Sequence, residues 1–157
     1  MTIEYCFLEE TDICYARYIG LTTSGDLQEN YGRYVVDPHY RPGRTELIDL
    51  SLGDFDAITY ASLTPLATIV NDINVNAGTH TATYVFAPSS VSFGTTRMYA
   101  SITSEMKGLS IYQAKTEREV LKLMGLPHHN IASFLRSQTI IPAALGSGAL
   151  MAEYMSA

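Results

Sequence analysis

The stretch between residues 35 and 51 constrains the fold of this chain more than any other segment. Its sequence, VVDPHYRPGRTELIDLS, is typical of a helix end, a turn and then a covered strand. Pro38 disfavours helical backbone at Asp37, and the Pro-Gly pair at 42–43 favours a turn. The apolar run at 45–50 suits a strand that is buried on both faces. A helix that leads through a short turn into such a strand indicates an α/β domain.

The length and composition indicate a single domain. The chain has 157 residues, of which 46% are hydrophobic and 17% are charged, which is enough to bury a sizeable core. The net charge of −6 argues against nucleic acid or an anionic membrane surface as a partner, because both attract basic proteins. No run of about 18 apolar residues is present that could span a bilayer.

Two features predict a reduced, cytoplasmic protein. The N-terminal sequence MTIEYCFLEE lacks the basic region and apolar core of a signal peptide. The two cysteines, Cys6 and Cys14, belong to a residue type that is common in buried cores as a free thiol. They lie in two neighbouring predicted strands, so a disulfide between them is the alternative.

Patterns typical of strands and helices alternate along the first 127 residues. The runs at 3–8 and 13–19 flank a polar tetrapeptide and predict a β-hairpin. Further strands are predicted at 45–50, 81–87 and 109–114, and helices begin near 23–24, 59–62, 89–90 and 116. The order ββαβαβαβα predicts a mixed sheet of about five strands, in which right-handed crossovers join parallel neighbours.

Local chemistry sets several of the predicted boundaries. Thr116 and Glu119 form a capping box at the start of the last helix, and Gly125 is suited to its C-cap. Residues 52–56 are predicted to form a loop. Pro65 fits the second helix only within the first turn, where its missing N–H group is not needed.

Residues 128–157 stand apart from this pattern. The segment is apolar but is interrupted by Pro142, Gly146 and Gly148, which argues against a long helix. We expect a C-terminal extension that packs on the domain or on a partner subunit, or is partly disordered. The alternative is a flap over a ligand pocket.

Three segments follow one another in an order and spacing that are found in a known family. They are DPHYRPG at 37–43 running into ELIDL at 46–50, FGTTRMY at 93–99, and residues 116–126 with their closing Met-Gly-Leu. Together they resemble the SpoIIAA-like group of small bacterial STAS-domain proteins, over about residues 1–127. The resemblance implies an α/β layered domain with a sheet flanked by helices, no cofactor, and often a homodimer.

The resemblance also implies a non-enzymatic regulatory or protein-interaction module. It would dock onto a protein partner through the regions near residues 51–65 and 88–99. In anti-sigma-factor antagonists of this family, a serine in an Asp-Ser-Ser-Gly loop before the second helix accepts a phosphate. That motif is absent at the comparable residues 57–60, where Thr59 is the candidate phosphoacceptor. The simpler interpretation is that Thr59 caps the helix.

Five further residues are candidate contacts for a partner or ligand. Asp49 is predicted at the carboxyl end of a central strand, where α/β proteins bind ligands, and Asp54 and Asp56 follow it. This acidic loop suggests a hydrolase as one alternative function, and a solvated loop as another interpretation. Arg97 and Tyr99 lie on the third predicted helix, where Arg97 could hold an anionic ligand or form a structural ion pair.

Recognisable catalytic and metal-binding motifs do not occur in the sequence. Histidines 39, 80, 128 and 129 lack metal-ligand spacing, and no P-loop, GxGxxG or GxSxG motif is present. We therefore predict no catalytic, cofactor-binding or metal residue. Eleven tyrosines without a tryptophan favour either a tyrosine-lined interface or ordinary half-buried positions.

A small-molecule or lipid binder is the second alternative function. The STAS fold is similar to the lipid-carrying SEC14 class, and the apolar C-terminal segment could cover an apolar pocket in such a protein.

Overall fold

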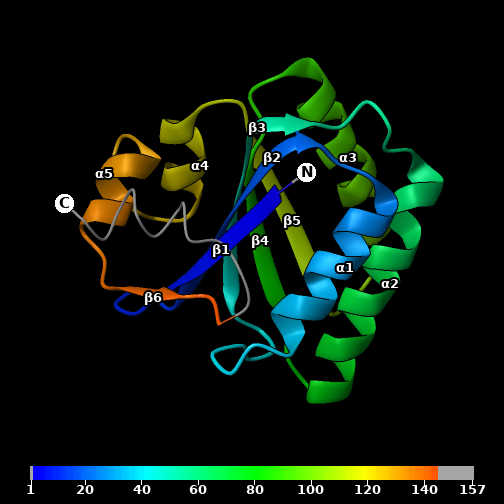
Figure 1. Cartoon of the computed structure of the whole chain (residues 1–157), viewed down its shortest axis with the longest axis horizontal. Coiled ribbons are helices and arrows are strands. Elements are labelled where there is room, and N and C mark those ends of the chain that lie inside the picture. The colour runs from blue at the N-terminus through cyan, green and yellow to red at the C-terminus, as the bar shows by residue number, and fades with distance from the viewer. Residues whose placement is uncertain (1, 145–157) are drawn as a thin grey trace.

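The structure is a computed structural model that describes residues 2–144 of the chain. These residues form one mixed sheet with the strand order β5-β4-β3-β2-β1-β6 (Figure 1). The strands are β1 (Thr2–Leu8), β2 (Ile13–Leu21), β3 (Thr45–Asp54), β4 (Thr81–Phe86), β5 (Leu109–Ala114) and β6 (Ile140–Pro142). Strands β2 to β5 are parallel neighbours, and β1 is antiparallel to β2 and β6. The predicted α/β class, mixed sheet and N-terminal hairpin are confirmed.

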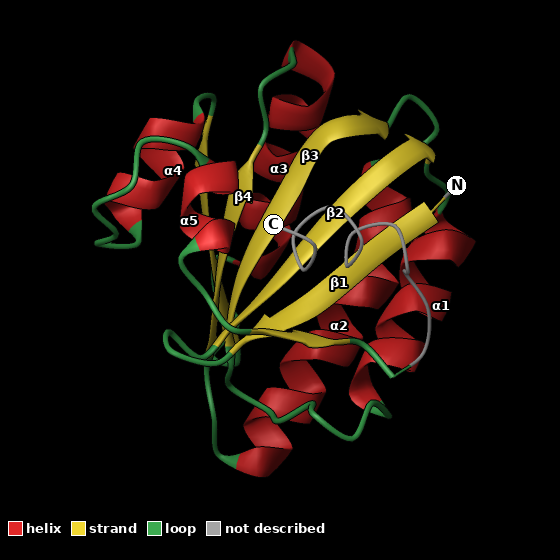
Figure 2. Ribbon diagram, turned by 60° about the vertical axis from the view of Figure 1, so that its left-hand side comes forward, coloured by secondary structure: helices red, strands yellow, loops and turns green. Residues whose placement is uncertain are grey.

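The helices cover both faces of the sheet (Figures 1 and 2). Helices α1 (Ser24–Val35), α2 (Tyr60–Ala77) and α3 (Ser90–Thr103) lie on one face, and α4 (Glu117–Leu123) and α5 (Ile131–Arg136) lie on the other. The first three helices share a face because each joins two adjacent parallel strands by a crossover of the same hand. No helix within residues 2–144 is long and apolar enough to cross a membrane.

The predicted helix starts are confirmed by their caps. The capping box predicted at Thr116 and Glu119 is only half formed, because Thr116 accepts the backbone N–H of Glu119 without a reciprocal bond. The Thr59 and Ser89 side chains accept a hydrogen bond from the third helical N–H, and reciprocal bonds complete the capping boxes. Gly78 ends α2 in the left-handed conformation that glycine adopts without steric cost. The prediction for Pro65 was wrong, because it lies in the second turn of α2. Pro65 is exposed, and so is Ala61, whose carbonyl loses its helical donor.

Two features of the sheet differ from the sequence-based prediction. The sheet has six strands because Ile140–Pro142 adds β6 antiparallel to β1, which is one more strand than expected. The prediction of a loop at 52–56 was wrong for its first three residues, because β3 continues to Asp54 and pairs with the end of β2. Gly53 permits this extension, since a Cβ atom there would lie 2.5 Å from the Phe55 ring.

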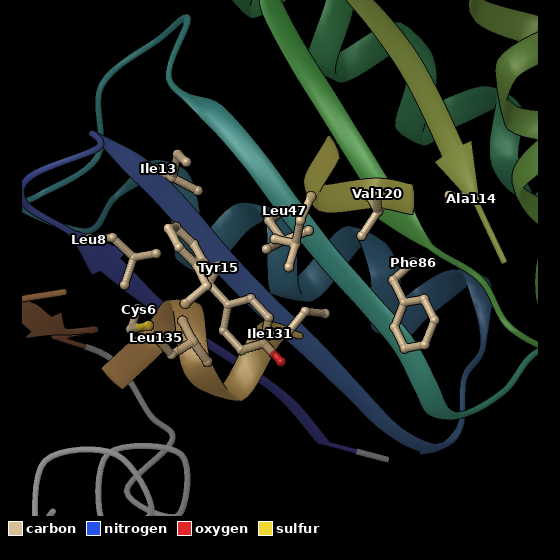
Figure 3. Close-up of a cluster of buried hydrophobic side chains, with 12 residues drawn as sticks. Cys6, Leu8, Ile13, Tyr15, Leu47, Phe86, Ala114, Val120, Ile131 and Leu135 are labelled. Carbon is tan, nitrogen blue, oxygen red and sulfur yellow. The ribbon is translucent and has the colours of Figure 1, made fainter. Parts of the chain in front are cut away.

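Buried side chains fill both sides of the sheet. The core under α4 and α5 contains twelve buried residues (Figure 3): Cys6, Leu8, Ile13, Tyr15, Leu47, Phe86, Ala114, Val120, Leu121, Ile131, Phe134 and Leu135. The opposite face has two clusters, one around Leu27, Leu50 and Leu63 and one around Tyr5, Cys14 and Tyr34. Cys6 and Cys14 are both free and lie on opposite faces of the sheet, so the disulfide alternative was wrong.

The described part of the C-terminal segment packs on the domain. Ile131, Phe134 and Leu135 of α5 are buried in the core, and β6 extends the sheet. The Thr139 side chain and backbone N–H donate hydrogen bonds to Glu10. Residues 145–157, on which the flap alternative depends, lie outside the described residues.

Candidate functional site

A cavity of about 130 Å³ lies between the sheet and helices α1, α2 and α3. Strands β2, β3 and β4 provide its floor, and the inward faces of the three helices provide its roof. Most of the wall is apolar and includes Leu27, Ile48, Leu63, Val70 and Val85. An apolar cavity of roughly 150 Å³ admits a benzene molecule, so this space suits a ligand of that size.

Glu46 of β3 is the charged residue of this wall. Its neighbours across the sheet are Cys14 and Thr83, and the Thr83 hydroxyl donates a 2.7 Å hydrogen bond to Oε1 of Glu46. Among residues 2–144, no lysine, arginine or histidine makes an ion pair with Glu46. Burial raises the pKa of Glu46 to about 7, and the Thr83 hydrogen bond opposes that rise.

Glu46 is closely surrounded by protein, yet part of its surface stays accessible. Protein surrounds the carboxyl group closely enough to raise its pKa strongly. Its side chain nevertheless keeps an intermediate accessible surface. Both observations follow if the accessible part faces the cavity, whose lining includes Glu46. The carboxyl group is therefore surrounded by protein but keeps a surface that a small molecule in the cavity can contact.

Tyrosine rings make up much of the remaining wall. Tyr18 comes from β2, Tyr31 and Tyr34 come from α1, and Tyr99 comes from α3. Burial raises the pKa of each hydroxyl, and the negative charge of Glu46 raises it further. Tyr40 extends the cluster, with its ring 4.8 Å from that of Tyr34 in an edge-on arrangement. All these hydroxyls stay protonated near neutral pH.

Asn30 places a second polar group on the roof of the cavity. Its side chain extends from α1, lines the cavity and is only 8% exposed. Its Oδ1 atom is buried and has no hydrogen-bond partner among the residues that the structure describes. A buried polar atom without a partner destabilises a protein by about 1–3 kcal/mol. Protein atoms cover Asn30 Oδ1, so it does not face the space of the cavity.

Together these groups are suited to binding. The cavity presents the carboxyl group of Glu46 within an apolar and aromatic wall. Burial raises the pKa of the Cys14 thiol well above its ordinary value, so this cysteine is no thiolate nucleophile. In residues 2–144, no group of three or more histidine, cysteine, aspartate or glutamate side chains could hold a metal ion.

Asp49 lies apart from Asp54 and Asp56, the other two acidic candidates. Asp49 lies in the middle of β3 on the α4 and α5 face, where its Oδ2 accepts a 2.9 Å hydrogen bond from the Tyr15 hydroxyl. Asp54 ends the strand five residues later, roughly 16 Å along it at 3.3 Å per residue. Asp54 and Asp56 are exposed, and Oδ1 of Asp54 accepts the backbone N–H of Asp56 at 3.0 Å.

Arg97 and Tyr99 of α3 also face different ways. Positions two apart on a helix point to opposite sides. Tyr99 lines the cavity, whereas Arg97 is exposed. Tyr99 is therefore the one predicted contact residue in the candidate site, and Arg97 lies outside it.

Sequence reasoning missed Glu46 and Asn30, although both leave a signal. Glu46 is a carboxylate within TELIDL, a strand that was predicted to be covered on both faces, where a charge needs a partner or a function. Asn30 follows Leu27 by three residues and precedes Tyr34 by four, so it shares their inward helix face.

No protein-family model, curated protein or solved structure matches this chain. The function of the cavity is therefore inferred from its geometry and chemistry.

Thr59 caps α2, and removing its hydroxyl should lower stability. Its Oγ1 accepts the backbone N–H of Ser62 at 3.2 Å. We expect Thr59→Ala to lower the free energy of unfolding by about 1 kcal/mol in urea denaturation, and Thr59→Ser to retain most of it. Thr64→Ala is the matched control, because the exposed Thr64 hydroxyl bonds only to the Tyr60 carbonyl. Equal effects of Thr59→Ala and Thr64→Ala would contradict the capping role.

Proposed function

We propose that this protein binds a small organic ligand in the cavity above Glu46. The supporting observation is a shielded carboxylate that faces a cavity and has no ion-pair partner among the described residues. Buried charges in purely structural positions are almost always paired, because an unpaired charge is costly to remove from water. A carboxyl group with a strongly raised pKa in a concave site is a marker of function.

The size of the cavity restricts the ligand. Sites for drug-sized molecules usually enclose about 300–1,000 Å³, whereas this cavity has about 130 Å³. It therefore suits a compact molecule of about one ring better than a lipid acyl chain. The roof consists of α1, α2 and α3, while α5 of the C-terminal segment lies across the sheet.

The other predicted functions find less support. Asp49 lies on the α4 and α5 face, away from the exposed Asp54 and Asp56, so the three carboxylates do not form one site for a hydrolase. No contact among the described residues favours a SpoIIAA-like regulatory module or a homodimer over a ligand binder. Both remain predictions from the resemblance.

Ligand binding can be tested with one-ring probes. We expect toluene, benzyl alcohol or benzylamine to bind saturably in calorimetric titrations and to shift the NMR methyl signals of Leu63 and Val85. Val70→Phe should weaken binding at least tenfold, because its ring would occupy the cavity that Val70 lines. The control is Ile69→Phe, which adds the same ring at an exposed neighbouring position on α2.

Circular dichroism of each variant would show that the fold is retained. If none of the three probes bound saturably to the wild-type protein, the proposed function would be wrong. Equal affinities of the Val70→Phe and Ile69→Phe variants would place the binding site elsewhere.

A further inference from the structure

The polar groups of the cavity favour a ligand that donates hydrogen bonds. A carboxylate can accept about four hydrogen bonds, and Oε1 of Glu46 accepts one from Thr83. Asn30 Oδ1 accepts none from the described residues. These acceptors lie on different walls, since Glu46 belongs to the sheet and Asn30 to α1. A small molecule between sheet and helices would meet the carboxyl group of Glu46, whereas Asn30 Oδ1 is covered by protein.

The charge of the cavity favours a cation. Its lining includes Glu46 but no lysine, arginine or histidine from the part of the chain that the structure describes. An anionic ligand would be repelled by the carboxylate, and an apolar one would leave it without a partner. A cationic ligand would supply the missing opposite charge in a space that is largely shielded from water.

The aromatic residues favour a cation as well. Tyr18, Tyr31 and Tyr99 contribute rings from β2, α1 and α3, and Phe55 lies beside Tyr18 with a centroid distance of 6.1 Å. The faces of aromatic rings attract ammonium groups within about 6 Å of the ring centroid, most strongly in desolvated sites.

From these three observations, and on the basis of the proposed function, we infer the class of ligand. We propose that the cavity binds a small organic ammonium ion, whose N–H groups donate to Glu46 and whose carbon skeleton packs among the tyrosine rings. The volume of about 130 Å³ limits the skeleton to about one ring.

The groups around Glu46 determine how binding responds to pH. Cys14 and Tyr18 of β2, Tyr31 and Tyr34 of α1, the loop residue Tyr40, and Tyr99 of α3 all interact with its charge. The pKa of each of these groups is raised, so all stay neutral near pH 7. Helix α2 contributes only apolar residues, and β4 contributes the Thr83 hydroxyl and Val85.

Glu46 is therefore the group whose charge changes near neutrality. Its pKa of about 7 means that an ammonium ligand meets a full negative charge above that pH. Below it, binding must first remove a proton, and the affinity should fall about tenfold for each pH unit. Ligand amines stay protonated throughout this range, like lysine.

The test compares benzylammonium with two neutral molecules of similar shape, benzyl alcohol and toluene. In calorimetric titrations at pH 7.5, we expect wild-type protein to bind benzylammonium at least tenfold more tightly than either. Glu46→Gln keeps the side-chain shape but removes the charge, so it should abolish that preference. Asp49→Asn, which neutralises a buried carboxylate on the opposite face, is the matched control and should retain the preference.

Each other outcome has a defined meaning. If toluene binds and benzylammonium binds no more tightly, the ammonium inference is overturned and the proposed function stands. If no probe binds, both are overturned. A preference for benzylammonium that persists in Glu46→Gln, or that does not fall below pH 7, would overturn the role of Glu46. Thermal unfolding of both variants confirms that each is folded before titration.

Discussion

Replacing Phe134 by alanine should lower the free energy of unfolding by about 3–5 kcal/mol. Phe134 has 0% exposed surface and packs in the core between the sheet and helices α4 and α5. Helix α5 has only six residues, too few to be stable alone, so it depends on this packing. Truncating the ring would leave a large cavity beneath the helix.

Urea denaturation followed by circular dichroism measures this loss. Ser133→Ala is the matched control, because Ser133 is exposed on the same helix. The free energy of unfolding of this variant should stay within about 0.5 kcal/mol of the wild-type value. A loss below about 1 kcal/mol for Phe134→Ala would mean that α5 is not an integral part of the core. A loss of the expected size would show that residues 131–136 contribute strongly to the stability of the domain.

The helix boundaries were the most predictable part of the fold. Thr59 and Ser89 cap helices through bonds to residues only three positions away. Gly78 ends α2 through its own backbone conformation. Such interactions are local in sequence, so they can be recognised without knowledge of the tertiary structure.

Features that depend on long-range contacts were missed. Strand β6 has only three residues, one of them Pro142, so it is too short to show a periodicity of two. It exists because β1 offers an unpaired edge, more than 130 residues away in the sequence. Likewise, β3 extends past Leu50 because β2 continues beside it as far as Leu21.

The same limit explains why Asp49 was chosen as a site residue and Glu46 was overlooked. Leu47 faces α4 and α5, whereas Ile48 and Leu50 face the other three helices. A strand with apolar residues on both faces shows no alternation, so its sequence cannot reveal which face a carboxylate occupies. Asp49 lies on a filled face, and Glu46 lies on the face with the cavity.

Glu46→Gln should also change how stability depends on pH. Burial raises the pKa of Glu46 in the folded protein from 4.5 to about 7. The folded state therefore holds this proton more tightly than the unfolded chain. The stabilisation that this raised pKa contributes is fully present below pH 4.5, falls as the pH rises towards 7, and is lost above it. The total loss is on the order of 3 kcal/mol, at 1.36 kcal/mol for each pKa unit.

The glutamine variant carries no titrating group at this position, so it should escape that loss. Relative to wild type, its free energy of unfolding should be higher at pH 8 than at pH 5 by about 2–3 kcal/mol. Urea denaturation across this range measures the difference. If Glu46→Gln and wild type lose stability in parallel, Glu46 is not a shielded carboxylate. The cavity would then lack the buried charge on which recognition of an ammonium ion depends.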